Sequence, residues 1–278
     1  MRYSIKQTSP LLDALANHFP ESSRNTLRTF LKDERVLVDG KLLTDPKQEV
    51  LAGQELQVLP RRLKKEGLLQ IIYEDKDLVV VDKPAGLLSV ATHFDTQNTV
   101  HAILKKRYIR RKVYVIHRLD QETSGVMMFA LSEEAYNKLK SDLAAHLVRR
   151  IDYGVVEGAL DSKGTWESYL LEDKNYLVHA HDKPTAGAER AVTHYETVRQ
   201  HGDFTLVRFE LETGKKNQIR VQSAKAGHPI YGDSKYGAKL PLSKRLYLHA
   251  FELHFTHPLT QKSLVFTSQL PKEFLQAL

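Results

Sequence analysis

The sequence contains no cysteine among its 278 residues. This absence excludes disulfide bonds, thiolate catalysis, and zinc or iron–sulfur sites with cysteine ligands. No apolar run approaches the roughly 18 residues that a membrane-spanning helix needs, and the opening MRYSIKQTSP contains no apolar signal-peptide core. Together these absences predict a cytoplasmic protein.

Three common motifs are also missing: the phosphate loop GxxxxGK[ST], the dinucleotide fingerprint GxGxxG and the nucleophile elbow GxSxG. Nucleotide hydrolysis, dinucleotide chemistry and the common serine hydrolase design are therefore disfavoured. A metal-dependent hydrolase remains an alternative, because His179, His181 and Asp182 could share a strand face and combine with His249 or His254. No zinc signature of recognised spacing completes that group, so a polar hairpin end is the favoured interpretation.

Lys and Arg outnumber Asp and Glu by 41 to 34, which gives a formal net charge of +7. This sign is expected of a protein that binds a polyanion such as a nucleic acid. A basic protein with a well-solvated surface would show the same balance, so composition alone does not identify the partner.

The first sixty residues predict a small separate α+β domain. Leu11, Leu12, Leu15 and His18 have helical spacing, and a second helix is expected after Ser22 or Ser23, either of which could cap it. The pair Asp39-Gly40 favours a tight hairpin turn. The charged stretch RRLKKEG, residues 61–67, has no apolar periodicity and is interpreted as a linker to a larger domain, residues 68–278.

From Leu68 onward, strand-like segments outnumber helices. Helices are expected after Ser132, a suitable N-cap, and from Gln218 to Gly227. The pattern predicts an α+β domain with a mostly antiparallel mixed sheet and peripheral helices, because regular strand–helix alternation is missing. The expected strands are LLQIIYE, DLVVVDK, VYVI, GVMMFA, DYGVVEG, AVTHYETV, FTLVRFEL, LYLHAFELHF and SLVFTS.

Polar side chains are concentrated in a few segments. In VYVIHRLDQETSGVMMFA, residues 113–130, two apolar strands flank a long polar interruption, which indicates either a site or a hairpin that bonds to its own backbone. In residues 211–237, Gly214 precedes cations at a helix start that could bind phosphate, although a capped surface helix fits equally. The basic run KKRYIRRK, residues 105–112, is typical of nucleic-acid contact or of a solvated helix end.

The string HRLDQETSG resembles the HRLDxxTSG signature of the pseudouridine synthase family that modifies large-subunit ribosomal RNA and transfer RNA. The resemblance covers residues 68–270. It extends, in the same order, to DLVVVDKPAGLLSV, DYGVVEG, LETGKKNQIRV, GHPIYGDSKYG and LYLHAFELHFTHP. Through SSRNTLRTFLKDERVLVDGK, the first sixty residues resemble the α-L RNA-binding module named for a small-subunit ribosomal protein.

The resemblance implies an RNA pseudouridine synthase that needs no cofactor and modifies uridines in ribosomal or transfer RNA, with ribosomal RNA favoured. A monomer without a membrane partner is expected. It makes Asp120 the catalytic carboxylate, Tyr153 the tyrosine beside the flipped uridine and Arg220 the partner of Asp120. Without the resemblance, Tyr153 is a strand tyrosine, and most strand tyrosines are packing residues. The resemblance further implies RNA or substrate contacts for Arg118, His117, Thr123, Lys215, Gln218, Arg24 and Arg28.

Some positions depart from the family pattern. Many members have Arg, His and His where this chain has Lys215, Asn217 and Gln222, and a basic residue where it has Ile151. These departures are interpreted as altered RNA contacts. An inactive relative that only binds RNA remains an alternative, and the sequence does not separate nucleophilic addition by Asp120 from abstraction of a ribose proton.

Overall fold

The computed structural model describes residues 2–33, 35–59, 69–92, 96–239, 243 and 245–277. The chain divides into two compact units, Met1–Leu63 and Lys64–Leu278. The predicted linker, residues 61–67, lies outside the described residues. None of the helices in these described ranges combines the length and apolar character that crossing a membrane requires.

The N-terminal unit contains two helices, α1 (Leu11–His18) and α2 (Arg24–Lys32), as predicted. The N-terminus of α2 is capped, because the Ser23 hydroxyl accepts a hydrogen bond from the Thr26 N–H at 3.2 Å. A four-stranded sheet has the order β1-β6-β3-β4, and a separate pair joins β2 to β5. These strands are β1 (Arg2–Ser4), β2 (Ser9–Pro10), β3 (Val36–Val38), β4 (Lys41–Leu42), β5 (Glu49–Val50) and β6 (Glu55–Val58).

The predicted hairpin at Asp39-Gly40 is confirmed: it joins β3 to β4, and both turn residues have positive φ, 49° and 77°. The core of this unit is fully apolar at its centre, where Leu11, Leu27 and Leu56 have no exposed surface. The opposite side of α2 carries exposed cations. The small domain therefore joins a buried apolar face to a basic outer face on one helix.

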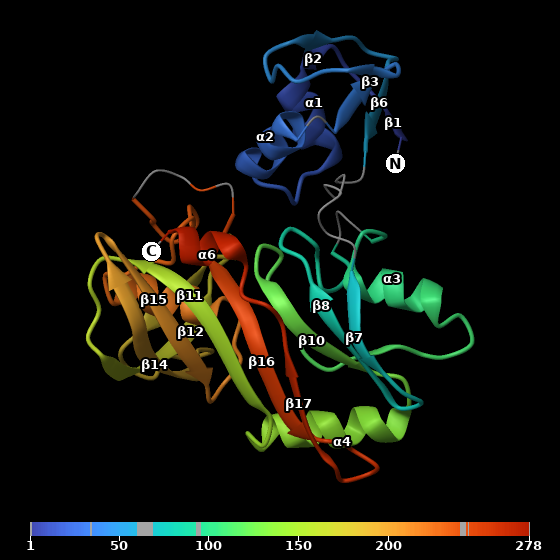
Figure 1. Cartoon of the computed structure of the whole chain (residues 1–278). Helices are drawn as coiled ribbons and strands as arrows, with labels where there is room; N and C mark the ends of the chain where they lie inside the picture. Colours follow the sequence, from blue (N-terminus) through green and yellow to red (C-terminus); the bar gives the residue numbers. More distant parts are fainter. Residues whose placement is uncertain are drawn as a thin grey trace. The chain divides into compact units, whose positions relative to one another are not determined.

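The second unit is built on an eleven-stranded sheet with the order β13-β12-β14-β15-β11-β16-β10-β8-β7, to which β17 and β9 add at β16 and β10 (Figure 1). Among the described residues, every pairing between two strands of this sheet is antiparallel except that of β10 with β16, which confirms the predicted mostly antiparallel sheet. The strands are β7 (Gln70–Glu74), β8 (Leu78–Lys83), β9 (Tyr114–Val115), β10 (Ser124–Ala130), β11 (Arg149–Glu157), β12 (Lys163–Glu172), β13 (Val178–His181), β14 (Glu189–His201), β15 (Phe204–Leu211), β16 (Leu248–Thr256) and β17 (Ser263–Thr267).

Within the described part of this unit, four helices accompany the sheet: α3 (Val100–Arg107), α4 (Glu133–Ala144), α5 (Gln218–Lys225) and α6 (Lys272–Gln276). The predicted helix after Ser132 is α4, whose first turn is capped where the Ser132 hydroxyl accepts from the Ala135 N–H at 3.3 Å. The helix expected from Gln218 is α5. Figure 1 shows α4 crossing one end of the sheet beneath β16 and β17.

A close backbone approach joins β10 to β16 at the centre of the sheet. Gly125 pairs with Ala250, and a Cβ at Gly125 would lie 2.0 Å from the carbonyl oxygen of Ala250. Because Gly125 also has φ +117°, only glycine suits this position. The contact brings the polar loop before β10 beside β16 and β11.

Helix α5 is held against the sheet by a buried amide. The side chain of Gln222 accepts from the Thr193 hydroxyl at 2.7 Å and donates to the Ser168 hydroxyl at 3.0 Å. These bonds join α5 to β14 and β12. The start of the helix is thereby fixed in position relative to the sheet.

Candidate active site

A cleft of about 790 Å³ lies in the second unit, lined by the loop before β10, by β11 and β16, and by the start of α5. Most of the predicted site residues of this unit line it. They are His117, Arg118, Asp120, Thr123, Lys215, Gln218 and Arg220. Asp120 and Arg220, 100 positions apart in the sequence, therefore meet in one cavity of the size usual for ligand sites.

The loop that carries Asp120 is fixed on both sides of the carboxylate. The hydroxyl of Ser89 donates to the Leu119 carbonyl at 2.6 Å and accepts from the Leu119 N–H at 3.0 Å. Beyond the carboxylate, the fully buried Lys83 donates from Nζ to the Gln121 carbonyl at 3.0 Å and to the Leu87 carbonyl at 2.7 Å. Burial lowers the pKa of Lys83 to about 7. These bonds hold Asp120 in place without using its side chain.

Arg220 joins Asp120 to a second, buried carboxylate. Its Nη1 donates to Asp120 Oδ2 at 3.1 Å, while Nε and Nη2 donate to the two oxygens of Asp233 at 2.6 and 2.8 Å. The Asp233 side chain is only 1% exposed, so this fork is the rigid part of the arrangement. Against the opposing effect of burial, the bonds and charges of Asp233 and Asp120 raise the pKa of Arg220. The guanidinium therefore places a permanent positive charge beside Asp120.

The structure separates Tyr153 from this cleft. On β11, Asp152 pairs with Ala250 of β16 and lines the cleft, whereas Tyr153 pairs with His249. Neighbouring residues of a strand point to opposite faces. The ring of Tyr153 packs edge-on against Phe251, with ring centroids 5.0 Å apart. The prediction that Tyr153 stands beside the substrate is therefore not supported by its position, and Asp152 is the pocket-facing neighbour.

Asp152 is 6% exposed, and its side chain makes no hydrogen bond within the described parts of the chain. Burial raises its pKa to about 7, the positive charge of Arg150 opposes this rise, and the negative charge of Asp120 adds to it. Arg150 donates from Nη2 to the carbonyls of Leu211 and Glu212, both at 3.4 Å. Sequence reasoning missed Asp152, Arg150 and Asp233; Asp233 lay in the quoted motif GHPIYGD without a role.

Gly214 leaves the room that Arg150 occupies. A Cβ at Gly214 would lie 2.1 Å from Nη1 of Arg150, so the side chain of Arg150 crosses the space above this glycine. The motif residue predicted to open a phosphate site thus accommodates a half-buried arginine of β11.

Of the other predicted contact residues in the second unit, some support the loop that carries Asp120, and one is free to contact a ligand. Nε2 of His117 accepts from the Met128 N–H at 3.1 Å, and burial lowers the pKa of His117 to about 3, so the ring is neutral. The N–H of the buried Thr123 donates to the Asp120 carbonyl at 3.2 Å. Arg118 is exposed at the cleft and makes no ion pair or hydrogen bond among the described residues. Arg118 is available to a ligand, whereas His117 and Thr123 support the loop.

Gln218 is fully engaged inside the protein. Its Oε1 accepts from the Thr213 hydroxyl at 2.7 Å and the Lys215 N–H at 3.0 Å, and its Nε2 donates to the Val192 carbonyl and the Thr193 hydroxyl. Lys215 forms an ion pair with Glu189 at 2.6 Å. Gln218 therefore fixes the loop that precedes α5. In the N-terminal unit, Arg24 and Arg28 are exposed on α2, and Arg24 pairs with Asp13 at 2.9 Å.

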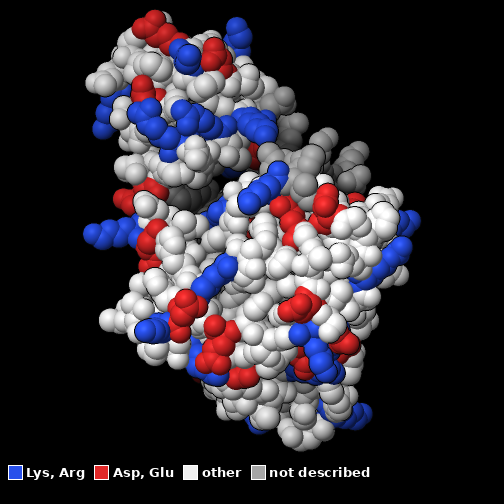
Figure 2. Space-filling model, turned by 90° about the vertical axis from the view of Figure 1, so that its left-hand side faces the viewer, with Lys and Arg blue, Asp and Glu red and all other residues white. Residues whose placement is uncertain are grey.

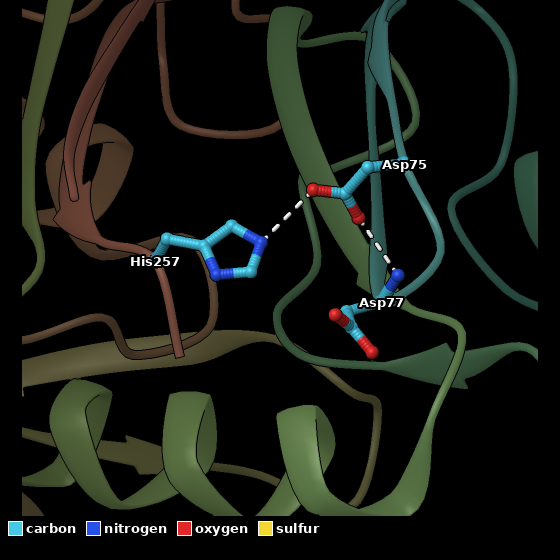
Figure 3. Close-up of side chains that lie close together, drawn as sticks. All are labelled: Asp75, Asp77 and His257. Atoms are coloured by element: carbon cyan, nitrogen blue, oxygen red, sulfur yellow. Dashed lines mark hydrogen bonds and ion pairs between the residues drawn. The ribbon is translucent and has the colours of Figure 1, made fainter. Parts of the chain in front are cut away.

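The described residues contain one group of side chains with the spacing of metal ligands: Asp75, Asp77 and His257 (Figure 3). Nε2 of His257 bonds to Asp75 Oδ2 at 2.9 Å, and its Nδ1 accepts from the N–H groups of Leu259 and Thr260. Both ring nitrogens are therefore engaged, and the group ties the turn after β16 to the hairpin of β7 and β8. The acceptor role of Nδ1 leaves the proton on Nε2, which donates it to Asp75.

The alternative metal site is not assembled in the part of the chain that the structure describes. His179 pairs with Asp173 at 2.9 Å, Asp182 pairs with Lys225, and neither belongs to a group with ligand spacing. The segment HAH forms β13 at the edge of the sheet. This placement agrees with the interpretation as a polar strand at a hairpin.

Comparison with known proteins identifies the family of this chain. Residues 77–225 match the family described as RNA pseudouridylate synthase, and residues 9–56 match the S4 domain. The chain belongs to the RNA pseudouridylate synthase family, a family of isomerases, and it carries an S4 RNA-binding domain. The resemblance inferred from HRLDQETSG is confirmed.

The individual relatives are more specific in name. The chain is 30% identical to "Ribosomal large subunit pseudouridine synthase D" of Haemophilus influenzae, over 95% of this chain and 88% of the relative. It is 33% identical to the protein of the same name from Pseudomonas aeruginosa, over 95% and 89%. Among solved structures, "Human RNA Pseudouridylate Synthase Domain Containing 4" matches with a TM-score of 0.62 and 25% identity, covering 75% of this chain and 91% of that one.

Proposed function

We propose that this enzyme isomerises specific uridines of large-subunit ribosomal RNA to pseudouridine, with Asp120 as the carboxylate that acts on the ribose or the base. The names of its relatives support ribosomal RNA as the substrate. The observation that carries the role of Asp120 is its position: it is partly exposed in the cleft, on a fixed loop, 3.1 Å from an arginine that a buried carboxylate orients.

The reaction breaks the bond between ribose C1′ and ring N1, turns the base, and forms a bond between C1′ and ring C5. No atom is lost and no oxidation occurs, so the chemistry can be carried by side chains. Asp120 serves either as a nucleophile or as a base toward the ribose, and both routes need a carboxylate held at the substrate. Arg220 can hold the Asp120 carboxylate in place, because the other edge of its guanidinium is anchored on the buried Asp233.

The uridine must leave its stack to reach this cleft, which requires a grip on the surrounding RNA. Arg118 makes no ion pair with any described residue, stands at the cleft and fits the role of displacing the target base. In this proposal the two predicted domains have separate tasks: residues 1–60 bind RNA, and residues 68–278 carry out catalysis. Figure 2 shows Lys and Arg side chains gathered in a band on the N-terminal unit, whereas on the second unit both charges are interspersed.

The test is conversion of defined RNA by purified protein. Large-subunit ribosomal RNA and transfer RNA lacking pseudouridine are incubated with the wild type and with Asp120→Asn, and pseudouridine is mapped by chemical sequencing. We expect conversion in ribosomal RNA by the wild type alone, with equal RNA affinity for both proteins. Conversion confined to transfer RNA would show that ribosomal RNA is not the substrate. Activity of Asp120→Asn would show that the Asp120 carboxylate is not required. RNA binding by the wild type without any conversion would identify an inactive relative.

A further inference from the structure

The cleft contains two carboxyl groups in opposite environments. Asp120 is 27% exposed in its side chain and forms an ion pair with Arg220. Asp152 is almost fully buried, faces the same cleft, and has no hydrogen-bond partner among the residues described. Carboxyl groups whose surroundings differ in this way divide the work of charged group and proton donor.

The isomerisation itself requires a proton to move. When the bond between N1 and C1′ breaks, its electron pair stays on the uracil ring, which becomes a better leaving group if N1 receives a proton. When C5 then bonds to C1′, the hydrogen on C5 must be removed as a proton to restore the ring. One group that first gives and then takes a proton satisfies both steps.

We propose that Asp152 is this proton-transfer group of the isomerisation: its carboxylic acid protonates the departing base, and its carboxylate then removes the proton from C5. This inference rests on the proposed function. The steps balance, because the proton given to N1 is replaced by the proton taken from C5 and Asp152 returns to its starting form.

The structure favours Asp152 over its neighbour for this work. Alternation along β11 turns the Asp152 carboxyl toward the cleft and the Tyr153 hydroxyl toward the opposite face of the sheet. A buried carboxylate with a purely structural role is expected to accept several hydrogen bonds, and Asp152 accepts none from the described residues. Its pKa of about 7 leaves both proton states accessible near neutral pH.

The charges around Asp152 come from several elements. The charge of Arg150 on β11 lowers the pKa of Asp152, whereas the charge of Asp120, in the loop before β10, raises it. From β15 and β16, the residues paired with it are the uncharged Phe209 and Ala250. The other charged side chains lining the cleft are Arg118, Lys140, Glu172, Lys215, Lys216, Arg220 and Glu252.

The experiment compares the wild type with three variants, Asp152→Asn, Asp152→Glu and the matched control Tyr153→Phe. Single-turnover rates are measured on an RNA that the wild type modifies, with hydrogen or deuterium at uridine C5, across a range of pH. For Asp152→Asn we expect unchanged RNA affinity and a rate about 10²- to 10⁴-fold lower. Its deuterium isotope effect should exceed that of the wild type, because removal of the C5 proton becomes slow.

The wild type and the two other variants test the assignment independently. Wild-type activity should fall as pH rises through about 7, the pKa of Asp152, and this limb should disappear in Asp152→Asn. Asp152→Glu retains a carboxyl group and should recover part of the rate even if the Asn variant folds poorly. Tyr153→Phe should keep the wild-type rate and isotope effect.

Three results would overturn the assignment: a wild-type rate for Asp152→Asn, an unchanged isotope effect in a slow Asp152→Asn variant, or loss of activity in Tyr153→Phe alone. The proposed function fails separately, because in that case the wild type itself converts no RNA and the inference falls with it. If the wild type is active, the Asp152 and Tyr153 variants alone decide whether Asp152 is the proton-transfer group.

Discussion

Arg220 shows how a single side chain can organise a site. Its guanidinium has two bonding edges, and the structure uses one on the buried Asp233 and the other on Asp120. A planar fork can do this, whereas a lysine ammonium is a point charge that cannot reproduce both edges. The two carboxylates consequently depend on one cation.

Replacement of Arg220 should affect stability and activity to different extents. We expect Arg220→Lys to keep partial activity, because the charge remains without the fork. Arg220→Met should be inactive and lose about 3–5 kcal/mol of unfolding free energy, because Asp233 is left buried without its partner. Single-turnover rates and urea denaturation measure the two effects, and a Met variant with wild-type values for both would show that the ion pairs contribute nothing.

The buried Asp152 should make stability depend on pH. Its pKa rises from 3.8 to about 7 in the folded state. Between these values the unfolded chain releases a proton that the folded chain keeps, so the free energy of unfolding falls as pH increases from about 4 to 7. Asp152→Asn removes this effect and should be more stable than the wild type at pH 8, by up to about 4 kcal/mol, and closer to it at pH 4. Denaturation at both pH values checks the sign; a constant difference would contradict it.

Among the secondary-structure elements, helix caps and the tight turn were predicted correctly, because short sequence patterns encode them. Ser23 and Ser132 cap α2 and α4 as expected, and Asp39-Gly40 forms the predicted turn. Of helix α3 only the end was anticipated, as one of two interpretations of residues 105–112, although Val100 and Leu104 form a buried helical stripe. Strand β12 was missed, and β13 was anticipated only as a strand face or hairpin end that carries His179 and His181.

The residues that line the cleft were predicted where they lie next to one another in sequence, and they were missed where packing decides which side chains face the cleft. Asp120 and its loop stand in one motif, and the pairing of Arg220 with Asp120 followed from the family resemblance. The choice between Asp152 and Tyr153 depends on which face of β11 meets the cleft. Both faces of this strand contain buried residues, so hydrophobic alternation does not reveal that choice.

Gly125 provides a test of the pairing between β10 and β16. Gly125→Ala places a Cβ 2.0 Å from the Ala250 carbonyl oxygen at φ +117°, so the two strands must separate. We expect a loss of at least about 3 kcal/mol in unfolding free energy, together with loss of activity. Gly227→Ala is the matched control, since Gly227 also has positive φ, +87°, but open space around its Cβ, and it should cost about 1 kcal/mol. Equal losses in the two variants would show that the close approach is unimportant.

At the scale of the whole molecule, the two units should be separable. Deleting residues 1–63 removes the exposed cations of α2, Arg24, Arg28 and Lys32, and leaves the cleft residues in place. We expect a folded catalytic unit with weaker RNA binding. The slope of log affinity against log salt should decrease by about 0.7 to 0.9 for each phosphate that these cations neutralise in the intact protein. Circular dichroism and binding at several salt concentrations test this; an unfolded product would refute the domain division, and an unchanged slope would exclude α2 from RNA contact.

The place of β16 in the large sheet has a consequence for how the protein is made. This strand separates β11 from β10, yet along the chain every other strand of the sheet except β17 precedes it. During synthesis the two halves of the sheet can form early as separate hairpins and meanders, but they have no common neighbour until β16 leaves the ribosome. Closure then depends on contacts between distant parts of the chain, such as Ser124 with His249, which makes it a slow step of folding. Because Leu248 and Ala250 of β16 line the cleft, the cleft of a nascent chain stays incomplete until this last central strand has been inserted.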